Sequence, residues 1–140
     1  MQQDSEKILV VDDEKNVLDA LKEIFAQSEY QLEFARSGKE CLEKVQSRLY
    51  NIVILDATLP DINALELLES VKNLDPQIRV IMMSWHTSAA KITEAFQKKA
   101  SEFILKPFQS KDVLNKVRKS LLFQRMSKSR EKAKHLMTME

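Results

Sequence analysis

In the stretch from Asn51 to Pro60, four consecutive apolar residues, Ile-Val-Ile-Leu, stand immediately before an acid, Asp56. An uninterrupted apolar run of this length is typical of a strand that is covered on both faces in a parallel sheet. Pro60 cannot continue a central strand, because proline has no backbone N–H to donate to the ladder. The stretch therefore predicts a buried strand that ends near Asp56, with one carboxylate at the edge where open α/β sheets bind ligands.

Four further segments have the length and composition of strands, and helical patterns lie between them. The strand-like segments are residues 7–11, 30–35, 78–83 and 102–105. Apolar residues recur at helical spacing in residues 14–27, 37–45, 65–71, 88–98 and 110–122. Strands that alternate with helices predict an α/β fold, a doubly wound five-stranded parallel sheet with helices on both faces.

Several helix starts carry capping signals. One of the acids in residues 12–14 is expected to cap the first helix, and Thr87 the fourth. Ser37 with Glu40 three residues later forms a capping box for the second helix. In the fourth helix the apolar spacing predicts that Phe96 faces inward.

The composition excludes several classes of protein. A single glycine, Gly38, excludes a glycine-rich phosphate loop. A single cysteine, Cys41, excludes an intramolecular disulfide; its helical setting predicts a buried packing residue, and a reducing, cytoplasmic compartment is expected. The first seven residues carry no apolar signal-peptide core, and no run of about 18 apolar residues occurs, so no membrane association is expected.

Polar residues follow four of the five expected strands. They are Asp12 and Asp13, Asp56, Ser84 and Lys106. Strand ends converge in a parallel sheet, and carboxylates that lie close together need a counter-charge to stay ionised. All-oxygen ligands suit Mg²⁺, and Lys106 offers a point charge to a phosphoryl oxygen. A carboxylate beside Mg²⁺, a lysine and a hydroxyl can attack phosphorus and become an aspartyl phosphate.

These motifs resemble the receiver domain of two-component response regulators. The matching segments are residues 10–14, Asp56 with residues 59–61, Ser84, and residues 106–108, and the resemblance covers residues 7 to about 122. All four occur in order at strand ends, and this combination is far more specific than any one of them. The resemblance implies a flavodoxin/CheY-like sheet in the order 2-1-3-4-5.

The resemblance also implies a role for each matching residue. Asp56 would be the phosphoacceptor, and Asp13 and Asp56 would bind Mg²⁺ directly with the main-chain carbonyl of Thr58. Asp12 would act mostly through a metal-bound water. Ser84 would contact the phosphoryl oxygens.

Lys106 would contact the same phosphoryl oxygens, and its bond to Pro107 is expected to be cis. Ser84 and Phe103 occupy the positions of the family's switch residues. Phosphorylation would move Ser84 toward the new oxygens and turn Phe103 inward, which changes the surface of the fourth helix, the fifth strand and the last helix.

The chain departs from the family pattern near the expected phosphate. Ala64 stands where glycine is common, so the backbone there must avoid a glycine-only conformation. Trp85 follows Ser84 where a small residue is preferred, and the hypothesis is that it slows access of small phosphodonors and of water. His86 and Thr58 occupy positions that influence the attack of water.

Three hypotheses follow from these residues. The first is a phospho-switch, not an enzyme beyond its own Mg²⁺-dependent phosphorylation and dephosphorylation, which takes its phosphoryl group from a sensor histidine kinase or a phosphotransfer protein. The second is a phosphohydrolase with an aspartate nucleophile; such enzymes usually place an acid where this chain has Thr58. The third is a degenerate module that binds a partner without phosphorylation.

The end of the chain differs in charge from the rest. Residues 110–140 hold nine basic and three acidic residues, a net charge of +6, whereas the remainder, with 13 and 18, carries −5. We predict a receiver domain over residues 1–122 and a basic C-terminal extension over 123–140, a possible helical linker to an absent output domain. The chain is then either a stand-alone receiver or a piece of a longer regulator.

The partners of the extension are only loosely constrained. Met126, Ala133 and Met137 recur at heptad-like spacing, which gives weak support to a coiled coil and a phosphorylation-linked dimer. Direct nucleic-acid binding is not expected, because no aromatic residues alternate with the basic ones. The kinase and the output domain or target protein stay unidentified.

Overall fold

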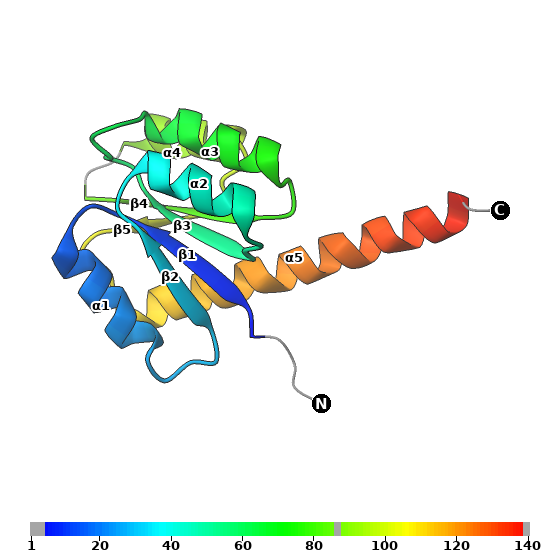
Figure 1. Cartoon of the computed structure of the whole chain (residues 1–140), viewed down its shortest axis with the longest axis horizontal. Coiled ribbons are helices and arrows are strands. Elements are labelled where there is room, and N and C mark those ends of the chain that lie inside the picture. The colour runs from blue at the N-terminus through cyan, green and yellow to red at the C-terminus, as the bar shows by residue number, and fades with distance from the viewer. Residues whose placement is uncertain (1–4, 86–87, 139–140) are drawn as a thin grey trace.

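A computed structural model describes residues 5–85 and 88–138 of the chain (Figure 1). In these residues five strands alternate with five helices. The strands are β1 (Lys7–Val11), β2 (Gln31–Ala35), β3 (Ile52–Asp56), β4 (Arg79–Ser84) and β5 (Glu102–Leu105). The helices are α1 (Lys15–Phe25), α2 (Gly38–Ser47), α3 (Ala64–Leu74), α4 (Ala89–Gln97) and α5 (Ser110–Thr138).

The strands form one parallel sheet in the order β2-β1-β3-β4-β5, which confirms the predicted fold class and strand order. All five residues of the central strand β3 are buried, as its unbroken apolar sequence predicts. The edge strand β2 is mostly half-exposed. The carboxyl ends of all five strands therefore lie along the same edge of the sheet, with β3 between β1 and β4.

Helices cover both faces of the sheet, and each face has its own core. In Figure 1, α1 and α5 lie on one side and α2, α3 and α4 on the other. Along β3, Ile52 and Ile54 belong to the core under α1 and α5, whereas Val53 and Leu55 belong to the other core. Full burial of such side chains contributes about 1.5–3 kcal/mol each. Cys41 is buried in the second core, and burial raises the pKa of its thiol to about 12, which makes it a packing residue.

The helix starts agree with the capping signals only in part. Ser37 caps α2 by accepting a hydrogen bond from the backbone N–H of Glu40 at 3.1 Å, but the Glu40 carboxylate reaches the N–H of Arg36 instead of completing the box. Glu14 stands at the N-cap of α1 without a side-chain cap, so the expected acidic cap is wrong. The Asp12 carboxylate instead accepts the N–H of Glu14 at 2.9 Å, within the loop.

Helix α4 packs on the sheet by a narrower face than its apolar spacing predicts. Ala95 is its one buried residue, and Phe96 is 44% exposed, so the inward placement of Phe96 is wrong. Ser88 caps the helix by accepting the N–H of Lys91 at 3.2 Å. The cap expected at Thr87 lies outside the described residues.

Small residues decide the geometry of the loops after β2 and β3. Gly38 does not have a positive φ; a Cβ built on it would lie 2.1 Å from Cγ2 of Ile62, so close approach is what requires glycine there. Asp61 holds the two loops together by accepting the N–H groups of Gly38 and Lys39 at 2.9 and 3.0 Å. Ala64 is the first residue of α3, and its backbone avoids the left-handed region. This confirms the prediction made from the presence of alanine where glycine is common in the family.

Helix α5 continues without a break from Ser110 to Thr138 and extends past the sheet (Figure 1). Its contact with the body reaches beyond residue 122, because Gln124 is 2% exposed. Gln124 donates to the carbonyl oxygens of Asn51 and Gln77, each at 2.8 Å, and accepts from the Asn51 amide at 3.0 Å. Further along, Glu131 accepts a hydrogen bond from Gln77 at 2.6 Å. Among the described residues, no helix combines the length and apolar character needed to cross a membrane.

Candidate functional site

Four polar side chains are buried at the carboxyl edge of the sheet. Asp12 follows β1, Asp56 ends β3, Ser84 ends β4 and Lys106 follows β5, and none of them is more than 5% exposed. The parallel register brings their strand ends to one edge, and the backbone N–H of Lys106 donates to the carbonyl of Ser84 at 2.8 Å. Polar groups buried at this density need partners, since unpaired charges are costly away from water.

Lys106 is the cation at the centre of this group. Its Nζ lies 2.7 Å from Oδ2 of Asp12, 3.2 Å from Oδ1 of Asp56 and 3.5 Å from Oε1 of Glu14. The peptide bond between Lys106 and Pro107 is cis, as the resemblance implies. One lysine, which follows β5, thus joins carboxylates at the ends of β1 and of the central strand β3.

The carboxylates form a cluster that could hold a metal ion. One oxygen from each of Asp12, Asp13, Glu14 and Asp56 lies within 4.8 Å of the others. Asp12 and Asp56 are buried, whereas Asp13 and Glu14 are exposed, so the cluster opens to solvent on one side. Four acids against one lysine leave excess negative charge, and an all-oxygen donor set fits a hard divalent cation.

The electrostatics differ between the acid and the lysine. Burial, followed by the charge of Asp12, raises the pKa of Asp56 to about 6, against the opposing effects of Lys106 and of the Thr58 N–H at 3.3 Å. Burial favours a neutral Lys106, but its hydrogen bond to Asp12 and the charges of Asp12 and Asp56 outweigh this and raise the pKa of Lys106. The lysine therefore stays charged, while the Asp56 carboxylate is under electrostatic strain.

A cavity of about 310 Å³ lies beside Asp56, on the side of the sheet that α4 covers. Thr58, Ser84 and Phe103 line it together with Met82 and Ala95. Phe103 is half-buried and packs against the core of that face. The structure thus places both residues of the predicted switch, Ser84 and Phe103, at one cavity.

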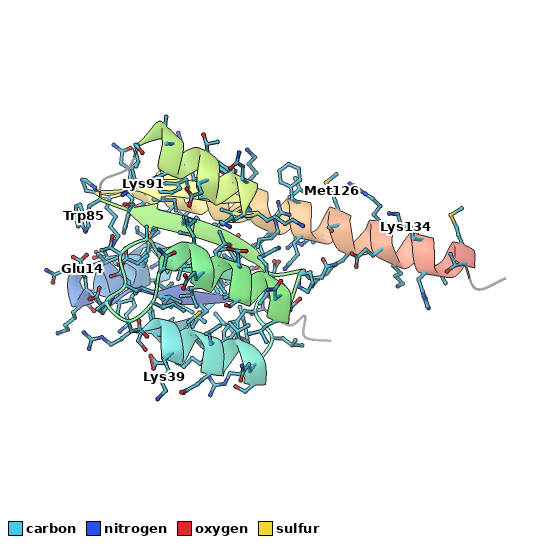
Figure 2. The ribbon with its side chains drawn as sticks, turned by 90° about the horizontal axis from the view of Figure 1, so that it is seen from above. Glu14, Lys39, Trp85, Lys91, Met126 and Lys134 are labelled. Carbon is cyan, nitrogen blue, oxygen red and sulfur yellow. The ribbon has the colours of Figure 1, made fainter. Side chains whose placement is uncertain are left out.

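Trp85 lies across the open side of the acidic cluster. The side chain is 46% exposed, and its Nε1 donates to Oε1 of Glu14 at 2.9 Å. The Nζ of Lys106 lies 5.6 Å from the centroid of the indole, within range of a cation–π interaction. Figure 2 shows Glu14 and Trp85 at the same end of the molecule.

The roles predicted for His86 and for the main-chain carbonyl of Thr58 stay predictions. His86 lies outside the described residues. The sequence places Glu14 in the matching segment 10–14 and makes it a possible helix cap, but it predicts no role for Glu14 in the site; the unbroken acidic run 12–14 is the signal that Glu14 faces the same edge.

Comparisons with known proteins agree with this geometry. The family model of the response regulator receiver domain matches residues 8–118. Chemotaxis protein CheY of Thermotoga maritima is 33% identical over 117 residues, which cover 81% of this chain and 98% of that protein. Sporulation initiation phosphotransferase F of Bacillus subtilis is 32% identical over 117 residues, covering 84% and 94%.

Solved structures show the same arrangement. The CheY-like receiver domain protein from Methanospirillum hungatei JF-1 superposes with a TM-score of 0.84 at 31% identity. The superposition covers 89% of this chain and 99% of that structure.

Proposed function

The chain belongs to the response regulator receiver family, and on this premise we propose that it is a phospho-switch that is phosphorylated on Asp56. Receiver domains relay signals from histidine kinases to output domains. The donor would be a histidine kinase or a phosphotransfer protein. The observation that carries the proposal is the Asp56 carboxylate, buried at the end of the central strand and 3.2 Å from the Nζ of Lys106.

The residues around Asp56 suit phosphoryl transfer. An Asp56 carboxylate oxygen attacks phosphorus as the bond from phosphorus to the donor atom breaks. The nitrogen of a phosphohistidine donor takes up a proton as it leaves, whereas acetyl phosphate releases acetate as the anion. Lys106 stays charged and lies beside Asp56, where it can pair with a phosphoryl oxygen as negative charge arrives. Burial keeps bulk water away from both groups, which strengthens their electrostatic interaction.

The acidic cluster would hold Mg²⁺. Asp13 and Asp56 would bind it directly with the Thr58 carbonyl, and Asp12 would bind through water. The observed donor set supports this, because four carboxylate oxygens come within 4.8 Å of one another and Lys106 supplies a single counter-charge. When bound, the ion supplies positive charge that lets the carboxylates stay ionised together.

The output would be a change of surface. Ser84 ends β4 and Phe103 lies in β5, and both line the cavity that reaches α4. A phosphoryl group on Asp56 would draw Ser84 toward it, and Phe103 would turn into the space released. This would shift the population of surface states over α4, β5 and α5, which a partner can read.

Labelling with acetyl phosphate and Mg²⁺ tests the proposal. We expect intact-mass analysis to show one added phosphoryl group on the wild-type chain and none on Asp56→Asn or without Mg²⁺. Asp19→Asn, at an exposed position on α1, is the matched control and should be labelled like the wild type. Labelling of Asp56→Asn would contradict the proposal, and turnover of an external phosphoester would instead favour a phosphohydrolase.

A further inference from the structure

The contact between Trp85 and Glu14 joins two segments that are distant in the sequence. Trp85 follows directly after β4, and Glu14 lies in the loop between β1 and α1. Their hydrogen bond spans 71 residues of the chain, with Nε1 donating to Oε1 at 2.9 Å. Both side chains are partly exposed, so packing in the core does not force them together.

The sheet order shows what this contact crosses. The strand β3 lies between β1 and β4, and Asp56 is its last residue. A side chain that reaches from the end of β4 to the end of β1 therefore passes over the carboxyl end of β3. Lys106, which contacts Asp56, lies under the face of the same indole. The carboxylate of Asp56 is itself buried, and its partner Lys106 lies between it and the indole in this chain of contacts.

Glu14 fixes the position of the indole and also belongs to the charged group below it. The oxygen that accepts the indole N–H is 3.5 Å from the Nζ of Lys106 and is part of the acidic cluster. A charged acceptor strengthens the bond to the indole. Breaking this hydrogen bond frees Trp85 to rotate away from the cluster.

We propose that the hydrogen bond between Trp85 and Glu14 is a latch over Asp56 that restricts phosphodonors too small to contact the indole. This inference rests on the proposed function of Asp56. A ligand opens a closed state only if it binds the open state better. A donor of the size of acetyl phosphate touches only the pocket, whereas a protein donor can also bind the displaced indole, a side-chain type enriched at interfaces.

Phosphorylation rates of five variants, three single and two double, test the latch. Trp85→Phe keeps an aromatic ring but removes the N–H donor, and we expect acetyl phosphate to label it about fivefold faster than the wild type, the factor of a typical net hydrogen bond. Glu14→Ala removes the acceptor, whereas Glu14→Gln removes the charge and keeps an acceptor oxygen. Acetyl phosphate should therefore label Glu14→Ala faster than Glu14→Gln when Trp85 is present. The two labelling rates should be equal when Phe replaces Trp85.

Equal labelling of Trp85→Phe and wild type would overturn the latch. So would an advantage of Glu14→Ala over Glu14→Gln that persists without Trp85, since Glu14 would then act by another route. If wild type and all variants stay unlabelled, the proposed function of Asp56 fails instead.

A second measurement decides on the latch without any phosphodonor. Trp85 is the only tryptophan of the chain, so its emission reports on this contact alone. We expect acrylamide to quench the emission more strongly in Glu14→Ala than in the wild type, with Glu14→Gln close to the wild type. Identical quenching in Glu14→Ala and wild type would show that Glu14 does not hold the indole.

Discussion

The two edges of the sheet bury polar groups in different ways. At the carboxyl edge, Asp12, Asp56 and Lys106 are charged groups, and the acids around one lysine leave an excess of negative charge. At the amino edge, a buried polar group is the neutral side-chain amide of Gln124, whose oxygen and nitrogen bind Asn51 and Gln77.

The difference separates a site from a structural contact. Neutral amides with satisfied hydrogen bonds stabilise the fold and hold α5 against the ends of the strands. The Asp56 carboxylate, whose pKa is raised by burial and by the charge of Asp12, reduces stability when it ionises, in return for a place where a cation and a phosphoryl group can bind. Removing the Gln124 amide and removing the Asp56 charge should therefore change stability in opposite directions.

The largest effect is expected at the amino edge. Gln124→Ala should lower the free energy of unfolding by about 3 kcal/mol, because the carbonyls of Asn51 and Gln77 and the Asn51 amide lose buried partners. Urea unfolding followed by circular dichroism measures this. The matched control Gln97→Ala, exposed at the end of α4, should stay within about 0.5 kcal/mol of the wild type. Similar free energies of unfolding for both variants would show that the Gln124 amide has no structural role.

At the carboxyl edge, we expect a mutation of Asp56 to raise the free energy of unfolding. Burial and Asp12 raise the folded-state pKa of Asp56 from 3.8 to about 6, so the folded state is penalised when Asp56 ionises. This penalty is absent below about pH 4, grows between pH 4 and 6, and is complete above that. Asp56→Asn should thus raise the free energy of unfolding by about 2 kcal/mol at pH 7.5 in a chelating buffer and leave it almost unchanged at pH 4. A less stable Asp56→Asn at pH 7.5 would contradict the comparison.

A third mutation, Gly38→Ala, tests how a loop contact at the carboxyl edge affects stability without changing any charge. Alanine normally stabilises a helix relative to glycine by about 1 kcal/mol, but Gly38→Ala places a methyl group 2.1 Å from Cγ2 of Ile62. We expect a loss of about 1–2 kcal/mol in unfolding free energy, because overpacking outweighs helix propensity. In the background Ile62→Ala the same change should be neutral or stabilising. A loss that persists there would point to backbone conformation instead of contact.

The smallest effect concerns an acid whose ionisation stabilises the fold. Glu33 accepts hydrogen bonds from Tyr50 at 2.7 Å and Arg48 at 2.6 Å; the Tyr50 bond is the main cause of its lowered pKa, while burial opposes it. Its contribution is complete above the unfolded pKa of about 4.5 and is lost as pH falls through the lower folded pKa.

Glu33→Gln should therefore cost about 0.5 kcal/mol at pH 7.5, since the group is partly exposed, and less at pH 3. Urea unfolding at the two pH values measures this, with the exposed Glu29→Gln as control. A larger cost at pH 3 would reverse the assigned sign.

The sequence predicts the arrangement of strands because burial and strand period leave direct marks on it. The apolar run before Asp56 specifies a central strand, and polar residues at the strand ends identify one edge of the sheet. The resemblance adds the strand order, which the residues alone do not specify. The structure then brings Asp12, Asp56 and Lys106 into contact at that edge.

Contacts between distant segments could not be predicted in this way. Phe96 recurs at helical spacing with the other apolar residues of α4, but this spacing alone does not show how narrow the buried face of the helix is. Gln124 looks like any polar residue of a solvated helix until the strand ends that it binds are located. Likewise, nothing local to Glu14 indicates that it accepts a hydrogen bond from Trp85, because that pairing follows from the sheet order.

The most direct test of the account is to locate the phosphoryl group on the chain. Borohydride reduces an aspartyl phosphate to homoserine, so labelling with acetyl phosphate and Mg²⁺ followed by reduction and peptide mass analysis identifies the acceptor. We predict homoserine at position 56 and unmodified aspartate at positions 12 and 13. Modification of Asp12 or Asp13 with Asp56 intact would contradict the assignment of the central strand's carboxylate as the phosphoacceptor.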